Sequence, residues 1–263
     1  MVETVFLSLL ISIFVGASAG YLGSLMVLEK MALVGDALSH VALPGLAIGY
    51  LLNFNPFIGG FAFLFVSAVM IWYVQRVTKL SFEALVGAAF TLALAVGIIL
   101  LREDPEALFE ALFGDITNVV LTDAVIAVVV SIAAILLTRV VYRKLVLAMI
   151  SEDLAISKGI DVAKTNLLYL FLVSVVVAVG IKIVGTLLVG FLVIVPAIAA
   201  RNLSPNIFRY TRASAVFGVM SAFSGVLLAS YFPEFAPGPL VVFSGIAIFA
   251  VTVVINKIKK LTV

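Results

Sequence analysis

Long runs of apolar residues fill this chain of 263 residues, and short stretches between them carry most of its charges. A helix needs about 20 mostly apolar residues to cross the hydrocarbon core of a bilayer. By that criterion the sequence predicts about nine spans, at 4–28, 34–52, 56–74, 82–101, 119–140, 164–182, 185–202, 211–231 and 238–256. The runs lack the period-two alternation of barrel strands, so we expect an all-α, polytopic transmembrane helical bundle.

Composition agrees with a bilayer as the solvent of this chain. Hydrophobic residues make up 64% and charged residues 11%, with a mean hydropathy of +1.32, whereas soluble domains average about 45–50% apolar and about 25% charged. No stretch between the spans is long enough to fold alone, so we expect one transmembrane domain over 1–263 in the cell (inner or plasma) membrane. The absence of cysteine excludes thiolate metal sites, and a net charge of +2 is too small to indicate nucleic-acid binding.

The positions of the charges predict the orientation of the chain. With the N-terminus outside and the C-terminus inside, almost all sixteen Lys and Arg residues fall on the cytoplasmic side, as the positive-inside rule requires. Arg102 falls outside, in an acidic loop at 102–118, and Lys182 lies near an outer boundary. No basic residue precedes the first apolar run, which continues past Ala19, so we expect a retained first span and not a cleaved signal peptide.

Asp36 and His40 are candidate metal ligands in the second predicted span. His40 is the only histidine, and a spacing of four places both side chains on one helix face. An ionisable residue inside a span costs about 2.5–3.5 kcal/mol on insertion scales and usually marks an ion or proton pathway. A carboxylate and an imidazole form a partial ligand shell for zinc, manganese or iron(II). The alternative is that Asp36 is an N-cap at the membrane boundary and His40 is hydrogen-bonded within the bundle.

A cytoplasmic segment at about 145–162 is the second candidate site. Ser151 is followed by Glu152 and Asp153, and Gly159 ends the segment, which predicts a short capped helix. Such a helix can dock into a groove of a soluble partner, or it can simply lie at the lipid headgroups.

Several motifs of enzymes are absent from the sequence. There is no G-x-x-x-x-G-K-[S/T] phosphate loop, no H-E-x-x-H and no G-x-S-x-G. The chain therefore has no nucleotide-binding loop of that type, and we expect a transporter subunit without its own ATPase site and not an enzyme.

The motifs together resemble the ABC-3 permeases, the membrane subunits of zinc, manganese and iron ABC importers. The resemblance begins at Gly35-Asp36-Ala37-Leu38-Ser39-His40 with Pro44-Gly45, and continues at Leu112 to Ile116 and at Glu152 to Ile160. It extends through 183–201 and Pro237-Gly238-Pro239, in the same order as in the family. One departure is Ile150, because the family often has phenylalanine before the acids of this segment.

The resemblance implies the assembly and the roles of the candidate residues. Such permeases form a homodimer, bind cytoplasmic ATP-binding-cassette ATPases, and receive metal from an extracytoplasmic metal-binding protein. The family pattern assigns Asp36 and His40 to the cation path, and it assigns the ATPase coupling helix to the segment with Glu152, Asp153, Ala155 and Gly159.

Our hypothesis from the sequence is import of a divalent metal, zinc or manganese with iron also compatible, by alternating access. The metal is then the transported substrate, no cofactor is bound permanently, and ATP is bound by the partner subunit. Two alternatives stay open: a permease for a larger chelate such as cobalamin or a siderophore, and a secondary metal transporter that works without ATP.

Overall fold

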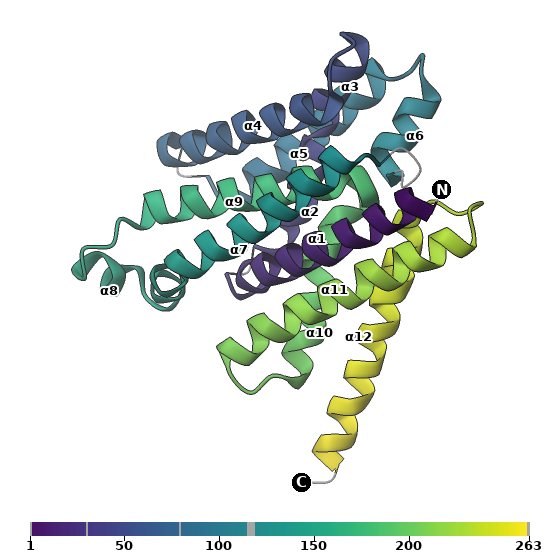
Figure 1. Cartoon of the computed structure of the whole chain (residues 1–263). Coiled ribbons are helices and arrows are strands. Elements are labelled where there is room, and N and C mark those ends of the chain that lie inside the picture. The colour runs from purple at the N-terminus through teal and green to yellow at the C-terminus, as the bar shows by residue number, and fades with distance from the viewer. Residues whose placement is uncertain (1, 30, 79, 115–118, 262–263) are drawn as a thin grey trace.

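A computed structural model describes residues 2–29, 31–78, 80–114 and 119–261 of the chain. Over these residues every regular element is an α-helix, which confirms the predicted all-α class. The helices, shown in Figure 1, are α1 (Val2–Leu28), α2 (Ala32–Val41), α3 (Leu43–Leu51), α4 (Pro56–Thr78), α5 (Phe82–Leu100), α6 (Pro105–Phe113), α7 (Leu121–Ile150), α8 (Glu152–Ser157), α9 (Val162–Val184), α10 (Thr186–Leu203), α11 (Ile207–Tyr231) and α12 (Pro237–Leu261).

Seven segments of the described chain are long and apolar enough to cross a membrane. They are Glu3–Leu28, Val34–Leu51, Pro56–Gln75, Leu121–Ile150, Val162–Ile181, Ile207–Tyr231 and Pro237–Lys259. Two shorter apolar helices, Ala84–Leu100 and Val189–Leu203, occupy the other two predicted spans. The structure thus has apolar helices at all nine predicted positions, and seven of them meet the length for a span.

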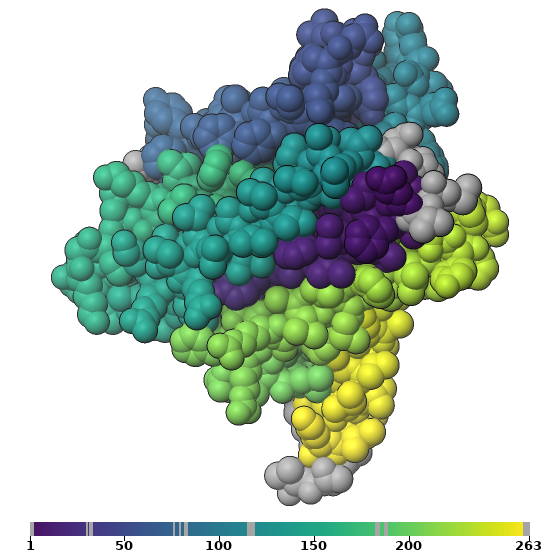
Figure 2. Space-filling model, viewed as in Figure 1, coloured from purple at the N-terminus to yellow at the C-terminus, as the bar shows by residue number. Residues whose placement is uncertain are grey.

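Helix α1 forms the centre of the bundle and packs against α7, α9, α10 and α11. Figure 2 shows α1 as a narrow strip between α7 and α11, so little of it reaches this face of the molecule. The contact with α11 is close, because the hydroxyl of Ser214 donates a hydrogen bond to the carbonyl oxygen of Gly20 over 2.5 Å. Small residues on both helices, Gly20 and Ser214, allow this close approach in lipid.

The predicted second span is confirmed as an apolar segment, Val34–Leu51, that is long enough to cross a membrane. It is divided at Ala42 into α2 and α3, because Pro44 lacks the N–H that a continuous helix would need. Two local predictions need correction. The acidic segment predicted as an outer loop contains α6, whose N-terminus is capped by the Asp104 carboxylate accepting from the Ala107 N–H. Helix α7 runs to Ile150, so the first part of the 145–162 segment belongs to a long helix and not to a loop.

The two ends of the bundle differ in what they carry. The N-terminal end of α1 and helix α6 lie at one end, on the right in Figure 1. Helix α8, the turn between α10 and α11, and the end of α12 lie at the opposite side, which we call the α8 end. Leu112, Phe113 and Gly114 of the Leu112 to Ile116 motif lie at the first end, with α6, and 115–118 are outside the described residues.

Candidate functional site

Asp36 and His40 lie inside α2, one helical turn apart. The N-cap of α2 is Met31, which makes no side-chain capping hydrogen bond, so the alternative that Asp36 caps this helix is wrong. The Ser39 hydroxyl, between the two candidates, donates to the carbonyl oxygen of Asp36 over 2.6 Å. A spacing of four within one regular helix gives both side chains the same face.

Gly190 of α10 packs directly against Asp36. A Cβ atom at Gly190 would lie 2.4 Å from the Asp36 Cα and 2.5 Å from its Oδ1. Carbon atoms in contact normally lie about 3.5–4.0 Å apart, so any side chain at this position would displace α2 from α10. Sequence reasoning missed Gly190, because nothing in its local pattern indicates which helix it approaches.

The imidazole of His40 is buried and lacks a hydrogen-bond partner at one nitrogen. His40 is 5% exposed, and its ring contacts Phe90 of α5 edge-on, with centroids 4.9 Å apart and an angle of 64°. Its Nδ1 atom has no partner among the described residues. An unsatisfied buried polar atom costs about 1–3 kcal/mol, and a ligand bound at this nitrogen would recover that cost.

One chain supplies too few side chains to hold a transition metal firmly. Across the described residues there is no group of three or more His, Cys, Asp or Glu side chains that could share an ion. Asp36 and His40 provide one oxygen and one nitrogen donor, whereas stable zinc sites use at least three protein ligands. A metal ion held here would need further ligands from water, backbone carbonyls or another chain.

Helix α8 confirms the short capped helix predicted after Ser151. The Ser151 hydroxyl accepts from the Leu154 N–H, and Gly159 ends the segment with φ +75°. Glycine suits this left-handed conformation, in which the Ile160 N–H donates to the carbonyl of Ala155 over 3.0 Å. The backbone at both ends of the helix is therefore satisfied without a partner.

The side chains of α8 divide into an inward and an outward set. Ala155 is fully buried, whereas Glu152 and Asp153 are exposed. Leu154 and Ile156 are also exposed, at 44% and 57%. An exposed short helix with two acids and two apolar side chains fits a protein-contact element, although these features do not identify the partner.

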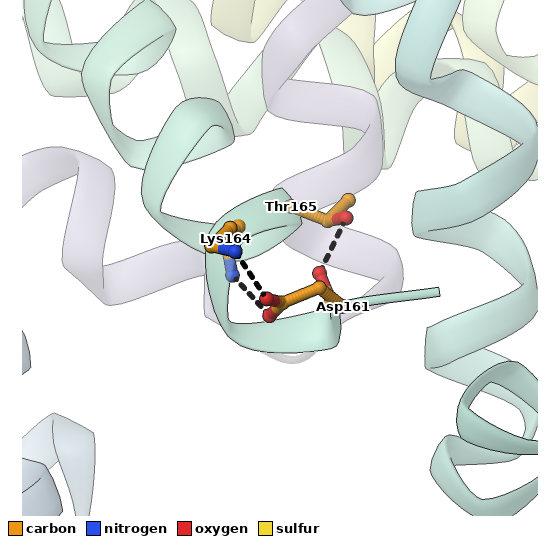
Figure 3. Close-up of polar contacts among 3 residues, drawn as sticks. All are labelled: Asp161, Lys164 and Thr165. Atoms are coloured by element: carbon orange, nitrogen blue, oxygen red, sulfur yellow. Dashed lines mark hydrogen bonds and ion pairs between the residues drawn. The ribbon is translucent and has the colours of Figure 1, made fainter. Parts of the chain in front are cut away.

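Hydrogen bonds of the Asp161 N-cap hold the backbone at the start of α9, just after α8 (Figure 3). The Asp161 carboxylate accepts from the Lys164 backbone N–H over 3.0 Å and pairs with the Lys164 ammonium over 3.0 Å. The Thr165 hydroxyl donates to the Asp161 carbonyl oxygen over 2.8 Å. Asp161 therefore caps a long helix that begins shortly after α8 ends.

A cavity of about 580 Å³ opens at the α8 end. Glu29, Gln75, Glu152, Asn166 and Tyr169 contribute its polar wall, and Asp36 and His40 do not line it. Glu29 follows the last residue of α1, and burial raises the pKa of its carboxyl from 4.5 to about 7, because the ionised form is poorly solvated there. We call this space the α8 cavity.

Comparison with known proteins supports one family over the whole chain. A family model described as the ABC 3 transport family matches residues 1–256. The chain is 30% identical over 244 residues to the manganese transport system membrane protein MntC of Listeria innocua, covering 92% of this chain and 87% of the relative. It is 29% identical over 266 residues to the high-affinity zinc uptake system membrane protein ZnuB of Buchnera aphidicola, covering 99% of this chain and 100% of the relative.

A solved structure agrees in fold as well as in sequence. The match is to PsaBC from Streptococcus pneumoniae in complex with Fab, with a TM-score of 0.82 and 30% identity. It covers 93% of this chain and 89% of the matched chain. This helical, multi-span chain is an integral protein of the plasma membrane, and it belongs to the ABC 3 transport family.

Proposed function

We propose that this chain is the membrane-spanning subunit of an ATP-driven importer for a divalent transition metal, manganese or zinc. The observation that carries the proposal is an aspartate and a buried, unpartnered histidine nitrogen on one face of α2, the first half of a segment long enough to cross the membrane. The similarity to relatives named for manganese and zinc transport narrows the substrate to these metals. Both metals accept a carboxylate and an imidazole ligand.

In the proposed topology all nine apolar helices cross the membrane, with the N-terminus outside and the C-terminus inside. The α8 end is then cytoplasmic. Support comes from the basic residues of that end, since Arg143, Lys144, Arg201 and Arg209 are all exposed there, and basic residues concentrate in cytoplasmic segments. The two shorter apolar helices cross beside longer ones, α5 against α2 and α3, and α10 against α1 and α11.

The metal path lies between two copies of this chain. Each copy contributes Asp36 and His40, and water or backbone carbonyls complete the ligand shell. The interruption at Ala42 and Pro44 directly follows His40, so the regular helix of α2 ends beside the proposed path. Incomplete and shared ligation suits a transporter, because an ion that is held too firmly cannot leave.

Partner subunits provide the energy and deliver the metal. The ATPase binds ATP and contacts α8 through Glu152, Asp153, Ala155 and Gly159, so nucleotide binding shifts α8 and, through the Asp161 cap, the start of α9. A metal-binding protein docks at the opposite end, near α6. Capped helix ends and exposed acidic and apolar side chains on α8 support the docking role.

Uptake of radiolabelled manganese or zinc tests the assignment. Vesicles contain the full complex, and permease variants Asp36→Ala and His40→Ala are compared with wild type. We expect each to lower uptake at least about a hundredfold, because the ion loses a side chain that binds it directly. Thr91→Val is the matched control, since the Thr91 hydroxyl is exposed and bonds only to its own helix.

Wild-type uptake by both Asp36→Ala and His40→Ala would overturn the site. A bound chelate that competes for uptake while free metal does not would favour the larger-substrate alternative.

A further inference from the structure

A small pocket lies where α10 turns into α11, at a membrane boundary. Its volume is about 190 Å³, and its wall consists of Leu28, Arg201, Ser204, Pro205, Asn206, Ile207 and Tyr210. The apolar part of α10 ends at Leu203 and the next span begins at Ile207. The pocket therefore lies at the depth where lipid headgroups meet the hydrocarbon, and neither candidate metal ligand contributes to it.

Tyr210 is a buried side chain of this pocket whose hydroxyl has no partner. The residue is 4% exposed, and its hydroxyl makes no hydrogen bond with any described residue. Its ring packs among Ala197, Ala200 and Phe217, which fixes the side chain in place. An unsatisfied buried hydroxyl costs about 1–3 kcal/mol, so a ligand that accepts its proton would recover that cost.

The charges around the pocket favour an anion. Arg201 lies in the last turn of α10 and is exposed. The first turn of α11 adds backbone N–H groups at Ile207 and Phe208 that have no acceptor within the helix, and the Asn206 side chain satisfies only the Arg209 N–H. A helix N-terminus attracts negative charge. The wall of the pocket, as described, holds a guanidinium and no carboxylate.

We propose that this pocket binds the phosphate of an anionic phospholipid from the adjacent leaflet. Arg201 supplies the charge, the α11 N-terminus supplies N–H donors, and Tyr210 donates its hydroxyl proton. A lipid fits better than free phosphate, because Leu28 forms part of the wall and the pocket opens at the end of two membrane helices. Basic residues at a membrane surface attract anionic lipids by about 1 kcal/mol each.

The site goes beyond metal transport and has its own test. Native mass spectrometry of the full complex, released from detergent, measures binding of phosphatidylglycerol, with phosphatidylcholine and inorganic phosphate as competing probes. Arg201→Gln is expected to weaken phosphatidylglycerol binding about fivefold. Tyr210→Phe, which keeps the ring and its packing, is expected to weaken binding by a similar factor.

Arg209→Gln is the matched control, because Arg209 is an exposed arginine of the same helix start that does not line the pocket. We expect it to change binding less than about twofold. The proposal is overturned if phosphatidylcholine binds equally well or if Arg209→Gln weakens binding as much as Arg201→Gln. It is also overturned if inorganic phosphate displaces the lipid at equal concentration, since the pocket would then be a free-phosphate site.

Discussion

The two candidate sites differ in whether their polar groups have hydrogen-bond partners. In α2 the His40 Nδ1 atom is buried without a partner, beside a helix break and under the ring of Phe90. In α8 the Ser151 cap and the Gly159 turn satisfy the backbone ends, and the acids are exposed to solvent. An unsatisfied group in an apolar setting can bind a ligand, whereas a satisfied and exposed helix offers a surface for contact. We therefore expect changes in α2 to affect metal ligation and changes in α8 to affect coupling.

Glu29 differs from the exposed acids of α8 because its carboxyl is largely buried. Replacing it should give the largest effect on stability. Its pKa is about 7 in the folded chain and 4.5 when solvated, so the folded state binds more protons between these values. The contribution of protonated Glu29 to the free energy of unfolding is fully present below pH 4.5 and is lost as pH rises through 7. At pH 8 the ionised carboxylate costs about 3 kcal/mol at most.

Glu29→Gln removes that cost, because the amide is neutral at every pH. Thermal unfolding of the solubilised complex between pH 5 and 8 should show a wild type that loses stability toward pH 8 and a variant that does not. Other titratable groups that line the α8 cavity are Glu152 and Tyr169, and Glu152→Gln is the control because Glu152 is exposed. An identical pH dependence for wild type and Glu29→Gln would show that Glu29 is solvated.

Gly190→Ala tests whether α10 holds Asp36 in place. The added methyl would overlap the Asp36 backbone, and overpacking of this kind costs about 2 kcal/mol. Gly87→Ala is the matched control, because nothing lies within 4 Å of a Cβ at Gly87; alanine there should be neutral or stabilise by up to about 1 kcal/mol.

The measurements are thermal unfolding of the complex and the KM for metal uptake. We expect Gly190→Ala to lower stability and raise KM together, since Asp36 moves. Equal behaviour of the two alanine variants would contradict the close packing of α2 on α10.

Gly159→Ala gives the smallest expected effect and probes α8. Nothing lies within 4 Å of a Cβ added at this position, so the loss of stability comes only from the backbone angle φ of +75° and is about 1 kcal/mol. We expect ATP hydrolysis to continue with less metal moved per ATP, because the end of α8 is reoriented. Ser157→Ala is the control in α8, and a ratio of transport to hydrolysis that is the same in both variants would argue against coupling through this turn.

The sequence predicted the positions of the helices well, but not which helices pack against one another. Apolar runs of helix length and charges between them predicted the positions of all nine apolar helices, and Ser151 predicted the cap of α8. The N-cap alternative for Asp36 failed, because helix α2 begins earlier than the polar pattern indicates.

The contacts of the site could not be predicted, because they join residues far apart in the chain. Gly190 and Phe90 reach Asp36 and His40 from α10 and α5, and no local spacing reports which helices meet. Helix α6 was missed for a different reason: nine residues are too few for a span, and its acids resembled a loop.

The most direct test uses the fact that His40 is the only histidine of the chain. Pulsed electron paramagnetic resonance of manganese(II) trapped in the complex of permease and ATPase, without the metal-binding protein, detects a directly bound imidazole nitrogen. We predict a nitrogen coupling in wild type that disappears in His40→Gln. Trapped manganese without any nitrogen coupling in wild type, or a coupling that persists in His40→Gln, would contradict metal contact at this helix.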